Sequence, residues 1–520
     1  MKTRKSLERA MVCAALLAYT GATGAWAQNA AVRSRVTQAV DDAVTVRLRG
    51  NVHPLAKPAF DQGALPDSQP LTRMLLLLQR SQEQELTLHQ LLDAQVTKNS
   101  GSYHAWLTPD QFGKQFGPSD SDVQAVTDWL TKQGFTIRNV AAGKTAIEFD
   151  GNVAQVRNAF HTEIHRFVVK GEQHFANVSD PAIPQALSQV VAGVAALHNF
   201  PKHSYVTRNG YYRRYKDTGK LEPLFTFGSP VNYAVGPTDF RTIYNITPST
   251  ADGSGQAIAI IADSNINPAD ITSYRTMFGL PAYTACTTPP TTGCLNVIVN
   301  GPDPGLNGDE VESDLDTQLA GGVAPNASIY LVVTEPTLSN PNQVSEGVDL
   351  SALYAVDNNL APVISDSFGE CEAGILTAGN QFYNALWEQA AAQGITVVVA
   401  TGDDGPAACD PSTDPNAATQ GLAVSGLAST PFNVAVGGTD FDPTSTTTGA
   451  STYWKPNTTG DVINSALTYI PETTWDDSPC AANYPTACTT LDTNGADISA
   501  ASGGPSNCIL GTAQSNGNIT

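Results

Sequence analysis

The sequence predicts an α/β protein whose second part is a parallel β-sheet flanked by helices, preceded by a smaller α+β unit. From residue 232 onward, short apolar runs alternate with helical stretches, which is typical of strands buried on both faces of a parallel sheet. Residues 40–199 instead mix alternating strands with amphipathic helices. Hydrophobic residues make up 41% of 520, which excludes a disordered chain and suffices for large cores.

Hydrophobic periodicity places the elements of the first unit. We expect strands over 44–49, 71–79, 136–140, 146–149 and 163–169, and helices over 82–96, 123–133 and 153–160. The segment from Ser119 to Asp122 offers a hydroxyl or carboxylate as the N-cap of the second helix. Residues 200–231 are basic and rich in turn-forming residues, so we expect a linker, exposed or processed, between two domains.

The second unit, residues 232–520, alternates strands and helices. We expect strands over 257–262, 328–333, 362–365 and 395–400, and helices over 310–319, 344–356 and 373–393. In such folds the active site lies at the carboxyl ends of the strands.

Charge and histidine divide the chain near residue 230. Residues 1–230 hold 25 Lys and Arg against 19 Asp and Glu (+6), whereas residues 231–520 hold 3 against 30 (−27). The second part cannot neutralise phosphate, which excludes a nucleic-acid partner there. All eight histidines precede residue 231, which excludes a Ser-His-Asp triad, a Cys-His pair and the commonest zinc sites within the second part.

The first 27 residues have the features of a secretory signal peptide: a basic start, a short apolar stretch and small residues before a cleavage site after Ala27. No later apolar run is long enough to span a bilayer, so we expect a secreted protein, extracellular or periplasmic, with no membrane partner after signal removal. Export favours disulfides, and spacing suggests the pairs 286–294, 480–488 and 371–409. Cys508 is left over, and we expect its partner in sequence that this chain lacks.

The densest chemical signal is the acidic stretch from Asn307 to Leu319. Two carboxylate pairs there are spaced four residues apart, Glu312 with Asp316 and Glu310 with Asp314, so each pair shares one helix face. Periodicity does not choose between them, because both flank an apolar stripe. That stripe consists of Val311, Leu315 and Leu319.

Two further segments add to this signal. The buried strand ending at Ala400 is followed by glycine and then Asp403 and Asp404, which places a carboxylate at the active-site edge of the sheet. The loop 499–506 is rich in small residues and could line a cleft. Each segment alone also fits an ordinary turn.

Several motifs resemble the sedolisins, or serine-carboxyl peptidases. Residues 103–119, continuing to 126–135, are similar to the signature of the pro-kumamolisin activation domain. The segment Glu312-Ser-Asp-Leu-Asp316 resembles the catalytic Glu-x-x-x-Asp pair of that family. Ser365-Asp-Ser-Phe-Gly369 resembles its substrate-binding strand, and Gly402-Asp403 its oxyanion aspartate.

The resemblance implies a subtilisin-like parallel sheet preceded by a ferredoxin-like activation prodomain. It implies an endopeptidase zymogen acting on proteins or peptides, with Glu312 as general base, Asp316 orienting it and Asp403 stabilising the oxyanion. It assigns substrate binding to Ser367, Gly369, Ser502 and Gly503. It also implies a calcium ion, bound by residues beyond the end of this chain.

The sequence departs from the family in one respect. The family's nucleophile lies in a Gly-Thr-Ser-x-x-x-Pro motif, and this chain contains no Gly-Thr-Ser. We therefore expect a fragment of a longer enzyme or a pseudoenzyme, and no peptidase activity from the chain as given. The alternative function is a secreted, non-catalytic binding protein.

Two other enzyme classes fit the sequence less well. Asp263 follows a strand as in subtilisins, but without histidine the triad cannot be completed, so Asp263 is interpreted as structural or ancillary. Glycoside hydrolases also use paired carboxylates, but their acids flank a bond and usually come from different strands. Adjacent turns of one helix fit that arrangement poorly.

Acid operation explains why carboxylates replace histidine. At pH ~4 an imidazole is already protonated, whereas a glutamate can still accept a proton. The opposite charges of the two parts predict that the prodomain docks on the peptidase domain and covers its cleft at neutral pH. We expect release in acid, as carboxylates lose charge and the histidines gain it.

Overall fold

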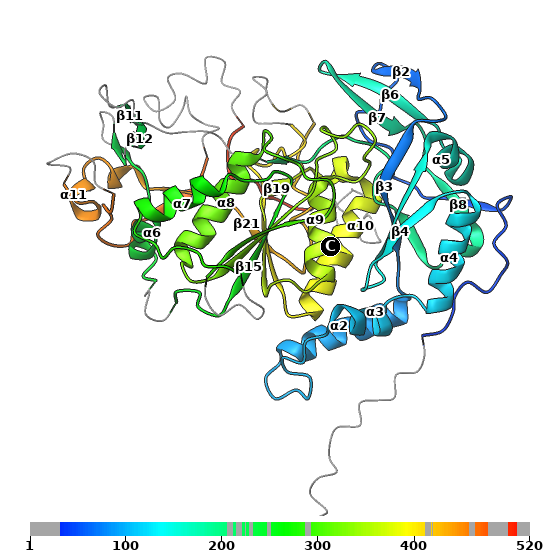
Figure 1. Ribbon diagram of the computed structural model, residues 1–520, viewed down its shortest axis with the longest axis horizontal. Helices are drawn as coiled ribbons and strands as arrows, with labels where there is room; N and C mark the ends of the chain where they lie inside the picture. The colour runs from blue at the N-terminus through cyan, green and yellow to red at the C-terminus, as the bar shows by residue number, and fades with distance from the viewer. Residues whose placement is uncertain are drawn as a thin grey trace, which may run out of the picture.

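The chain forms two units that lie side by side, each with its own sheet (Figure 1). The computed structural model describes residues 32–204, 212–214, 221–223, 225–227, 232–246, 251–286, 293–410, 418, 420–456, 463–476 and 498–506. We refer to the elements from β1 (Thr45–Arg47) to β9 (Val191–Val194) as the first unit and to those from α6 (Pro237–Ile243) onward as the second unit.

The first unit is built on a four-stranded antiparallel sheet in the order β4-β5-β3-β9. Its elements are β3 (Pro70–Leu78), α4 (Asp120–Lys132), β4 (Thr136–Val140), β5 (Ala146–Asn152), α5 (Val153–Phe160) and β9 (Val191–Val194). This succession of strands and helices, with this strand order, is the ferredoxin-like arrangement that the resemblance implied. A second sheet, in the order β2-β6-β7, comprises β2 (Asp61–Ala64), β6 (Ile164–Val169) and β7 (Glu172–Asn177).

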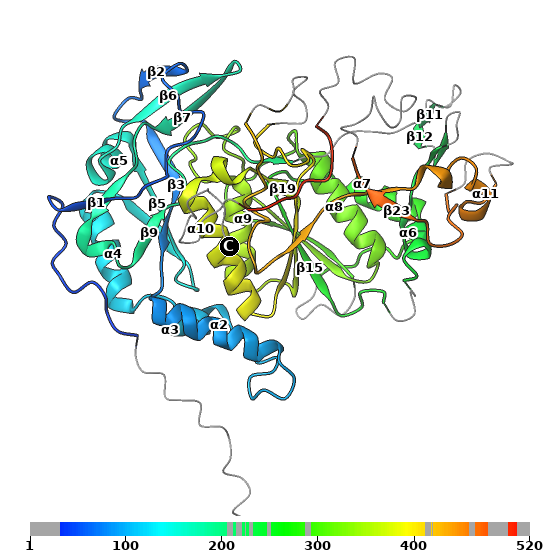
Figure 2. The same cartoon turned by 180° about the vertical axis from the view of Figure 1, so that it is seen from behind.

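Strand β3 is buried on both faces, which explains its unbroken apolar run. Leu76 and Leu78 belong to the core of the first unit. Leu75 and Leu77 point to the opposite face and share a core with α10 (Glu372–Ala392) of the second unit. Because successive side chains of a strand alternate in direction, one strand packs against two cores. The view from behind shows β3 and β9 beside α10 (Figure 2).

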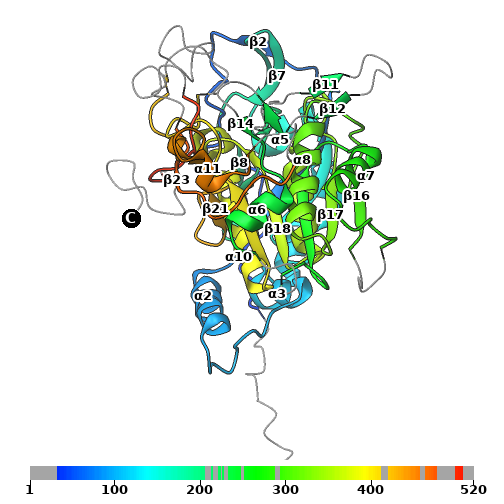
Figure 3. The ribbon, with the colours of Figure 1, turned by 90° about the vertical axis from the view of Figure 1, so that its left-hand side faces the viewer.

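Helix caps fix where the helices of the first unit begin. Helix α2 (Gln82–Val96) coincides with the predicted range, and Ser81 forms a capping box with Gln84. Ser119 caps α4 by accepting a hydrogen bond from the Asp122 backbone N–H. The sequence did not predict α3 (Pro109–Phe116), which together with α2 extends along one side of the molecule and reaches α10 (Figure 3).

The second unit contains a six-stranded parallel sheet in the order β16-β17-β15-β18-β20-β21. Its strands are β15 (Ala257–Ala262), β16 (Leu295–Val299), β17 (Ser328–Val333), β18 (Val363–Asp366), β20 (Thr396–Ala400) and β21 (Val434–Val436). The four central strands confirm the prediction. The edge strands β16 and β21 were not predicted, because β16 is only half-buried, β21 is exposed, and neither carries a continuous buried run.

Helices flank this sheet, and the three predicted helices are present. They are α8 (Glu310–Val323), α9 (Gly347–Asp357) and α10. Helix α8 packs against α7 (Pro268–Met277) and α6 (Pro237–Ile243), whereas α9 packs against α10. The predicted parallel sheet covered by helices is therefore confirmed.

Two disulfides join the predicted cysteines, Cys286 with Cys294 and Cys371 with Cys409. The proposed pair 480–488 and Cys508 lie outside the described residues. Among the described helices, none combines the length and the apolar character needed to cross a bilayer.

Candidate active site

The parallel sheet brings carboxylates from separate strands to one edge. Asp263 directly follows β15, Asp366 is the last residue of β18, and Asp403 follows β20. Parallel strands end at the same edge, so these groups gather there together with the first turns of α8.

Helix α8 separates the two carboxylate pairs that periodicity left equivalent. Glu312 is only 5% exposed. Asp316, one turn later, accepts a hydrogen bond at Oδ1 from the Ser367 hydroxyl at 2.9 Å, just after β18. Glu310 and Asp314 instead gather with Asp270 of α7, with carboxylate oxygens within 4.8 Å of one another. The pair Glu312 and Asp316 is therefore the one on the sheet side of the helix.

The apolar stripe expected on α8 is not part of the core. Leu315 and Leu319 are 37% and 46% exposed. The buried face carries Glu312, Ser313 and Thr317 instead, and the Ser313 hydroxyl donates to the Ser264 backbone carbonyl at 3.0 Å. Small hydroxyl side chains let α8 lie close to the sheet and leave its buried face polar, which suits a site for proton transfer.

Burial makes Asp316 and its neighbour Asp366 easy to protonate. Desolvation raises the pKa of Asp316 to about 6, although the hydrogen bond from Ser367 opposes the shift. Desolvation raises the pKa of Asp366 to about 7, and the charges of Asp349 and Asp316 add to the effect. Asp366 was not among the predicted site residues, although it lies beside the predicted Ser367.

Asp403 is held in a turn that pairs with the small-residue loop 498–506. The Ala500 backbone N–H donates to the Asp403 carbonyl at 3.0 Å, and the Ser502 N–H donates to the Gly402 carbonyl at 2.9 Å. The Ser502 hydroxyl accepts from the Asp404 N–H at 3.0 Å. Burial, with a smaller contribution from the charge of Asp404, raises the pKa of Asp403 to about 6.

The segment 366–370 connects these two groups of carboxylates. At its start, Asp366 interacts electrostatically with Asp316. At its end, Glu370 interacts with Asp404, and burial raises the pKa of Glu370 to about 7. The predicted residues Glu312, Asp316, Ser367, Asp403 and Ser502 therefore lie on segments that meet at the same edge of the sheet. Gly503, next to Ser502, is exposed.

The start of the linker is paired with the predicted substrate-binding strand. Strand β10 (His203–Ser204) pairs antiparallel with β19 (Phe368–Gly369), so that His203 lies opposite Gly369. The Ser204 hydroxyl donates to the carboxylate of Asp309, the residue before α8. The linker therefore covers the β19 edge of the site.

A lysine of the same segment is anchored among carboxylates of the second unit. The Lys202 ammonium lies 2.9 Å from Asp349 Oδ2, and the two side chains are 11% and 6% exposed. Tyr383 donates its hydroxyl to the other Asp349 oxygen. The charge of Lys202 also acts on Glu346 and Asp366. The sequence did not predict this cluster. A signal was present, because the second part has thirty carboxylates and only three basic residues of its own, so a lysine from outside it could pair with a buried carboxylate.

Asp263 is buried at the end of β15. It is 2% exposed, and burial, with the charges of Asp309 and Glu346, raises its pKa well above the usual value. Its backbone carbonyl accepts a hydrogen bond from the Asn307 side chain at 2.8 Å. This backbone contact, which any residue could make, helps to hold the turn that precedes α8.

Comparison with known proteins agrees with this architecture. Residues 59–200 match the pro-kumamolisin activation domain, and residues 298–517 match the subtilase family. The first match covers most of the first unit and the second match most of the second unit, and we name the two units the activation domain and the subtilase-family domain after these matches.

Relatives of this chain include xanthomonalisin, sedolisin and kumamolisin. The chain is 31% identical to xanthomonalisin from Xanthomonas sp. over 71% of its own length and 45% of that protein. It is 29% identical to sedolisin from Pseudomonas sp. over 69% of its length and 59% of that protein, and 26% identical to kumamolisin from Bacillus sp. over 84% and 74%. It thus spans about half the length of the first two relatives.

Among solved structures, the chain is similar to Pseudomonas sedolisin, a serine-carboxyl proteinase complexed with two molecules of pseudo-iodotyrostatin. The identity is 25% and the TM-score 0.37, over 54% of this chain and 64% of that one.

Proposed function

We propose that this chain is the zymogen form of a secreted, acid-active serine-carboxyl peptidase of the sedolisin type that hydrolyses peptide bonds of proteins. The observation that carries the proposal is the buried face of α8. Glu312 and Asp316 lie there one turn apart, Asp316 bonds to Ser367, and the same region of the sheet edge holds Asp403. Its domain contains no histidine.

In this proposal the α8 pair moves the proton of the attacking nucleophile. Glu312 accepts the proton from a serine hydroxyl as that oxygen attacks the scissile carbonyl, and later returns it to the leaving amine. Asp316 orients Glu312, and Ser367 fixes Asp316 in turn. With a pKa of about 6, Asp316 is protonated in mild acid.

Asp403 stabilises the tetrahedral intermediate. Since its pKa is about 6, its carboxyl group is protonated at pH ~4 and can donate a hydrogen bond to the developing oxyanion. Above pH ~6 it becomes a carboxylate, which would repel that oxyanion. The acid range of the activity follows from this requirement.

The nucleophile and calcium are not assigned to described residues. The printed sequence contains no Gly-Thr-Ser, so the proposal assigns the attacking serine to no residue of it. Asp270, Glu310 and Asp314 offer oxygen ligands of the kind that calcium prefers. Carboxylates also gather at surfaces without an ion, so the expected calcium remains without assigned ligands.

The contacts between the units support an inhibited precursor. The pairing of residues 203–204 with β19 supports this, because extended peptides bind exposed strands by main-chain hydrogen bonds and a substrate at β19 would compete for the same edge. Lys202 anchors this segment through Asp349. Two further contacts join the units elsewhere: the Arg80 guanidinium pairs with the buried Glu388, and the Ala142 N–H donates to Asp357 at 2.5 Å.

Acid proteolysis of a denatured protein tests the function. The precursor, expressed from its complete gene, is incubated with casein at pH ~4, and new N-termini are counted. We expect cleavage that the variant Glu312→Gln abolishes and the variant Glu310→Gln retains. Undiminished cleavage by Glu312→Gln would remove Glu312 as the base. Absence of cleavage by the wild type at every acidic pH would favour a non-catalytic binding protein.

A further inference from the structure

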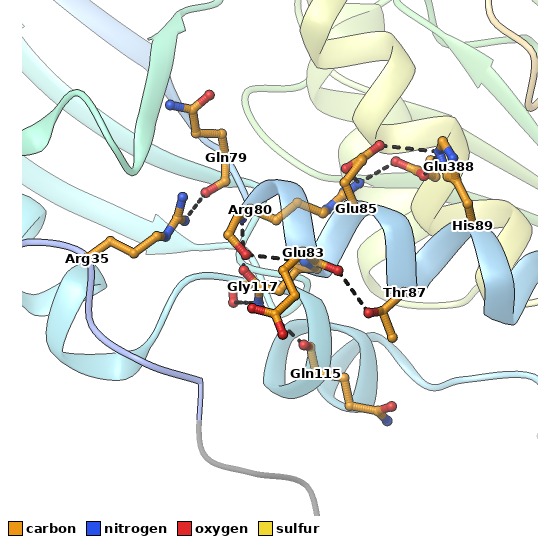
Figure 4. Close-up of polar contacts among 12 residues, drawn as sticks. Arg35, Gln79, Arg80, Glu83, Glu85, Thr87, His89, Gln115, Gly117 and Glu388 are labelled. Carbon is orange, nitrogen blue, oxygen red and sulfur yellow. Dashed lines mark hydrogen bonds and ion pairs between the residues drawn. The ribbon is translucent and has the colours of Figure 1, made fainter.

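Three side chains converge at the contact between the two units, away from the candidate active site. Glu85 and His89 lie four residues apart on α2 of the first unit, and Glu388 lies on α10 of the second (Figure 4). His89 Nε2 is 3.1 Å from Glu388 Oε1 and 3.3 Å from Glu85 Oε1. One potential ligand atom from each residue lies within 4.8 Å of the other two.

These separations fit the edges of a metal coordination polyhedron. Zinc binds nitrogen and carboxylate oxygen at about 2.0–2.1 Å, usually with tetrahedral geometry, which places neighbouring ligand atoms about 3.4 Å apart. The two measured separations are within a few tenths of an ångström of that value. Glutamate and histidine four residues apart share one helix face, so α2 presents two ligands together.

Oε1 of Glu388 is a buried oxygen that faces the His89 imidazole but makes no hydrogen bond within the described residues. The Glu388 side chain is 0% exposed. A buried carboxylate oxygen without a hydrogen bond is costly unless a cation faces it. His89 is 52% exposed, so the imidazole connects this buried oxygen to solvent and leaves a route for an ion to enter.

Arg80 holds the two glutamate side chains of this cluster in position. Its Nη1 pairs with Oε2 of both carboxylates, at 2.8 Å from Glu85 and also in contact with Glu388. Each carboxylate thus uses Oε2 for Arg80 and directs Oε1 toward His89. Groups that hold the second oxygen of a carboxylate ligand commonly orient it for a metal.

From this geometry we propose that Glu85, His89 and Glu388 bind a divalent transition metal such as Zn²⁺, with water completing the coordination. The mixed nitrogen and oxygen donors favour such a metal over calcium or magnesium, which prefer oxygen alone. Two ligands come from the activation domain and one from the subtilase-family domain, so the ion clamps the two domains together. The site does not depend on peptidase activity.

Zinc titration of the chain tests the clamp. The 520-residue protein, free of affinity tags and stripped with a chelator, is titrated with Zn²⁺ at pH ~7.5 by isothermal calorimetry. We expect one equivalent to bind, with the affinity falling at least tenfold in His89→Ala and in Glu85→Gln. Cobalt should give the intense visible bands of a four-coordinate site in the wild type and not in His89→Ala.

The chain offers a matched control in His165. This histidine also contacts two carboxylates, Asp61 through Nδ1 at 2.8 Å and Glu163 through Nε2 at 3.2 Å. Because the two contacts use opposite ring nitrogens, the three residues cannot share one ion. His165→Ala should therefore bind zinc as tightly as the wild type.

Thermal unfolding gives a second readout in case a variant is destabilised. Zinc should raise the unfolding temperature of the wild type and of His165→Ala, because a ligand that binds only the folded state stabilises it. It should leave His89→Ala unchanged. Saturable binding of equal affinity in wild type, Glu85→Gln and His89→Ala would overturn the proposal, and so would no saturable binding by the wild type.

Discussion

The two domains of the chain carry opposite electrostatic patterns, and the same change of pH acts on them in opposite ways. The activation domain holds the histidines, several of them buried, whereas the subtilase-family domain has none and buries carboxylates instead. Acidification therefore places charge inside the first domain and removes charge from inside the second. Under the proposed function, one fall in pH would both loosen the activation domain and protonate the buried carboxyls of the subtilase-family domain.

In the activation domain the buried histidines form an aromatic cluster. His53 stacks on Phe200 with ring centroids 3.9 Å apart, His174 stacks on the same ring at 4.3 Å, and His53 lies 4.7 Å from His198. Burial lowers the pKa of all three, that of His53 to about 3. Such a group stabilises the fold above its unfolded pKa near 6.5, and that stability is lost as pH falls from there toward about 3.

In the subtilase-family domain the sign is reversed. Burial raises the pKa of Asp316 and Asp403 to about 6 and that of Asp366 and Glu370 to about 7. Burial penalises the ionised form of each carboxyl, so the stability of this domain rises as pH falls from about 7 toward the unfolded carboxyl pKa of ~4.

The largest expected effect is at Glu312. Replacing it with glutamine removes the proposed base and should lower kcat by about 10³-fold, within the usual range for general-base catalysis. Glu310→Gln, on the α7 side of the same helix turn, should change kcat less than threefold. Peptide hydrolysis at pH ~4 measures both, and a similar loss in the two variants would contradict the assignment of the pair.

At Asp403 a somewhat smaller loss is expected. Asp403→Ala deletes one oxyanion donor and should lower kcat by about 10²- to 10³-fold with little change in KM. Asp440→Ala, at an exposed aspartate on β22 (Thr439–Phe441), serves as the control. An Asp403→Ala effect confined to KM would indicate a role in substrate binding.

Lys202 tests the contact between linker and enzyme. Lys202→Met leaves the buried Asp349 without its cation, and breaking a buried pair typically costs several kcal/mol, so activation at pH ~5 should be at least tenfold faster. The exposed Lys98→Met is the control. Loss of the precursor band on gels follows the rate, and an unchanged rate would remove Lys202 as an anchor.

The smallest effect is expected at the histidine cluster. In His53→Asn the amide oxygen can still accept the hydrogen bond that the Leu55 N–H donates to His53 Nδ1, but the residue no longer titrates. The acid-unfolding midpoint of the activation domain should fall by about half a pH unit to one unit. Circular dichroism across pH 7 to 3 detects this shift, with the exposed His161→Asn as control. An unchanged midpoint would show that groups other than His53 cause the acid unfolding.

Much of the fold could be predicted from the sequence, because its elements follow clear periodicities. The range of α2 was predicted to the residue, and β15, β17 and β20 follow from continuous apolar runs. Helix α3 was not predicted, since it contains Gly113 and buries only two apolar side chains, Phe112 and Phe116. The edge strands β16 and β21 lie at the margins of the sheet and bury less of their surface. Their sequences therefore lack the continuous buried run that predicted the central strands.

The site could be predicted only in part. The resemblance chose the pair Glu312 and Asp316, which periodicity could not, and the structure shows the physical distinction in the hydrogen bond from Ser367. The anchoring of Lys202 by Asp349 joins residues 147 apart, so no local pattern reports it. The zinc ligands proposed here also come from two domains, whereas the sequence excluded zinc only within the second.

The most direct test of the central claim is the pH dependence of kcat/KM for the wild type and Asp403→Asn. If a protonated carboxyl at Asp403 supports catalysis, wild-type kcat/KM should fall as pH rises through about 6, whereas the amide, which donates at every pH, should move that decline upward. Coincident profiles for the two proteins would contradict the account, because the decline would then belong to another group.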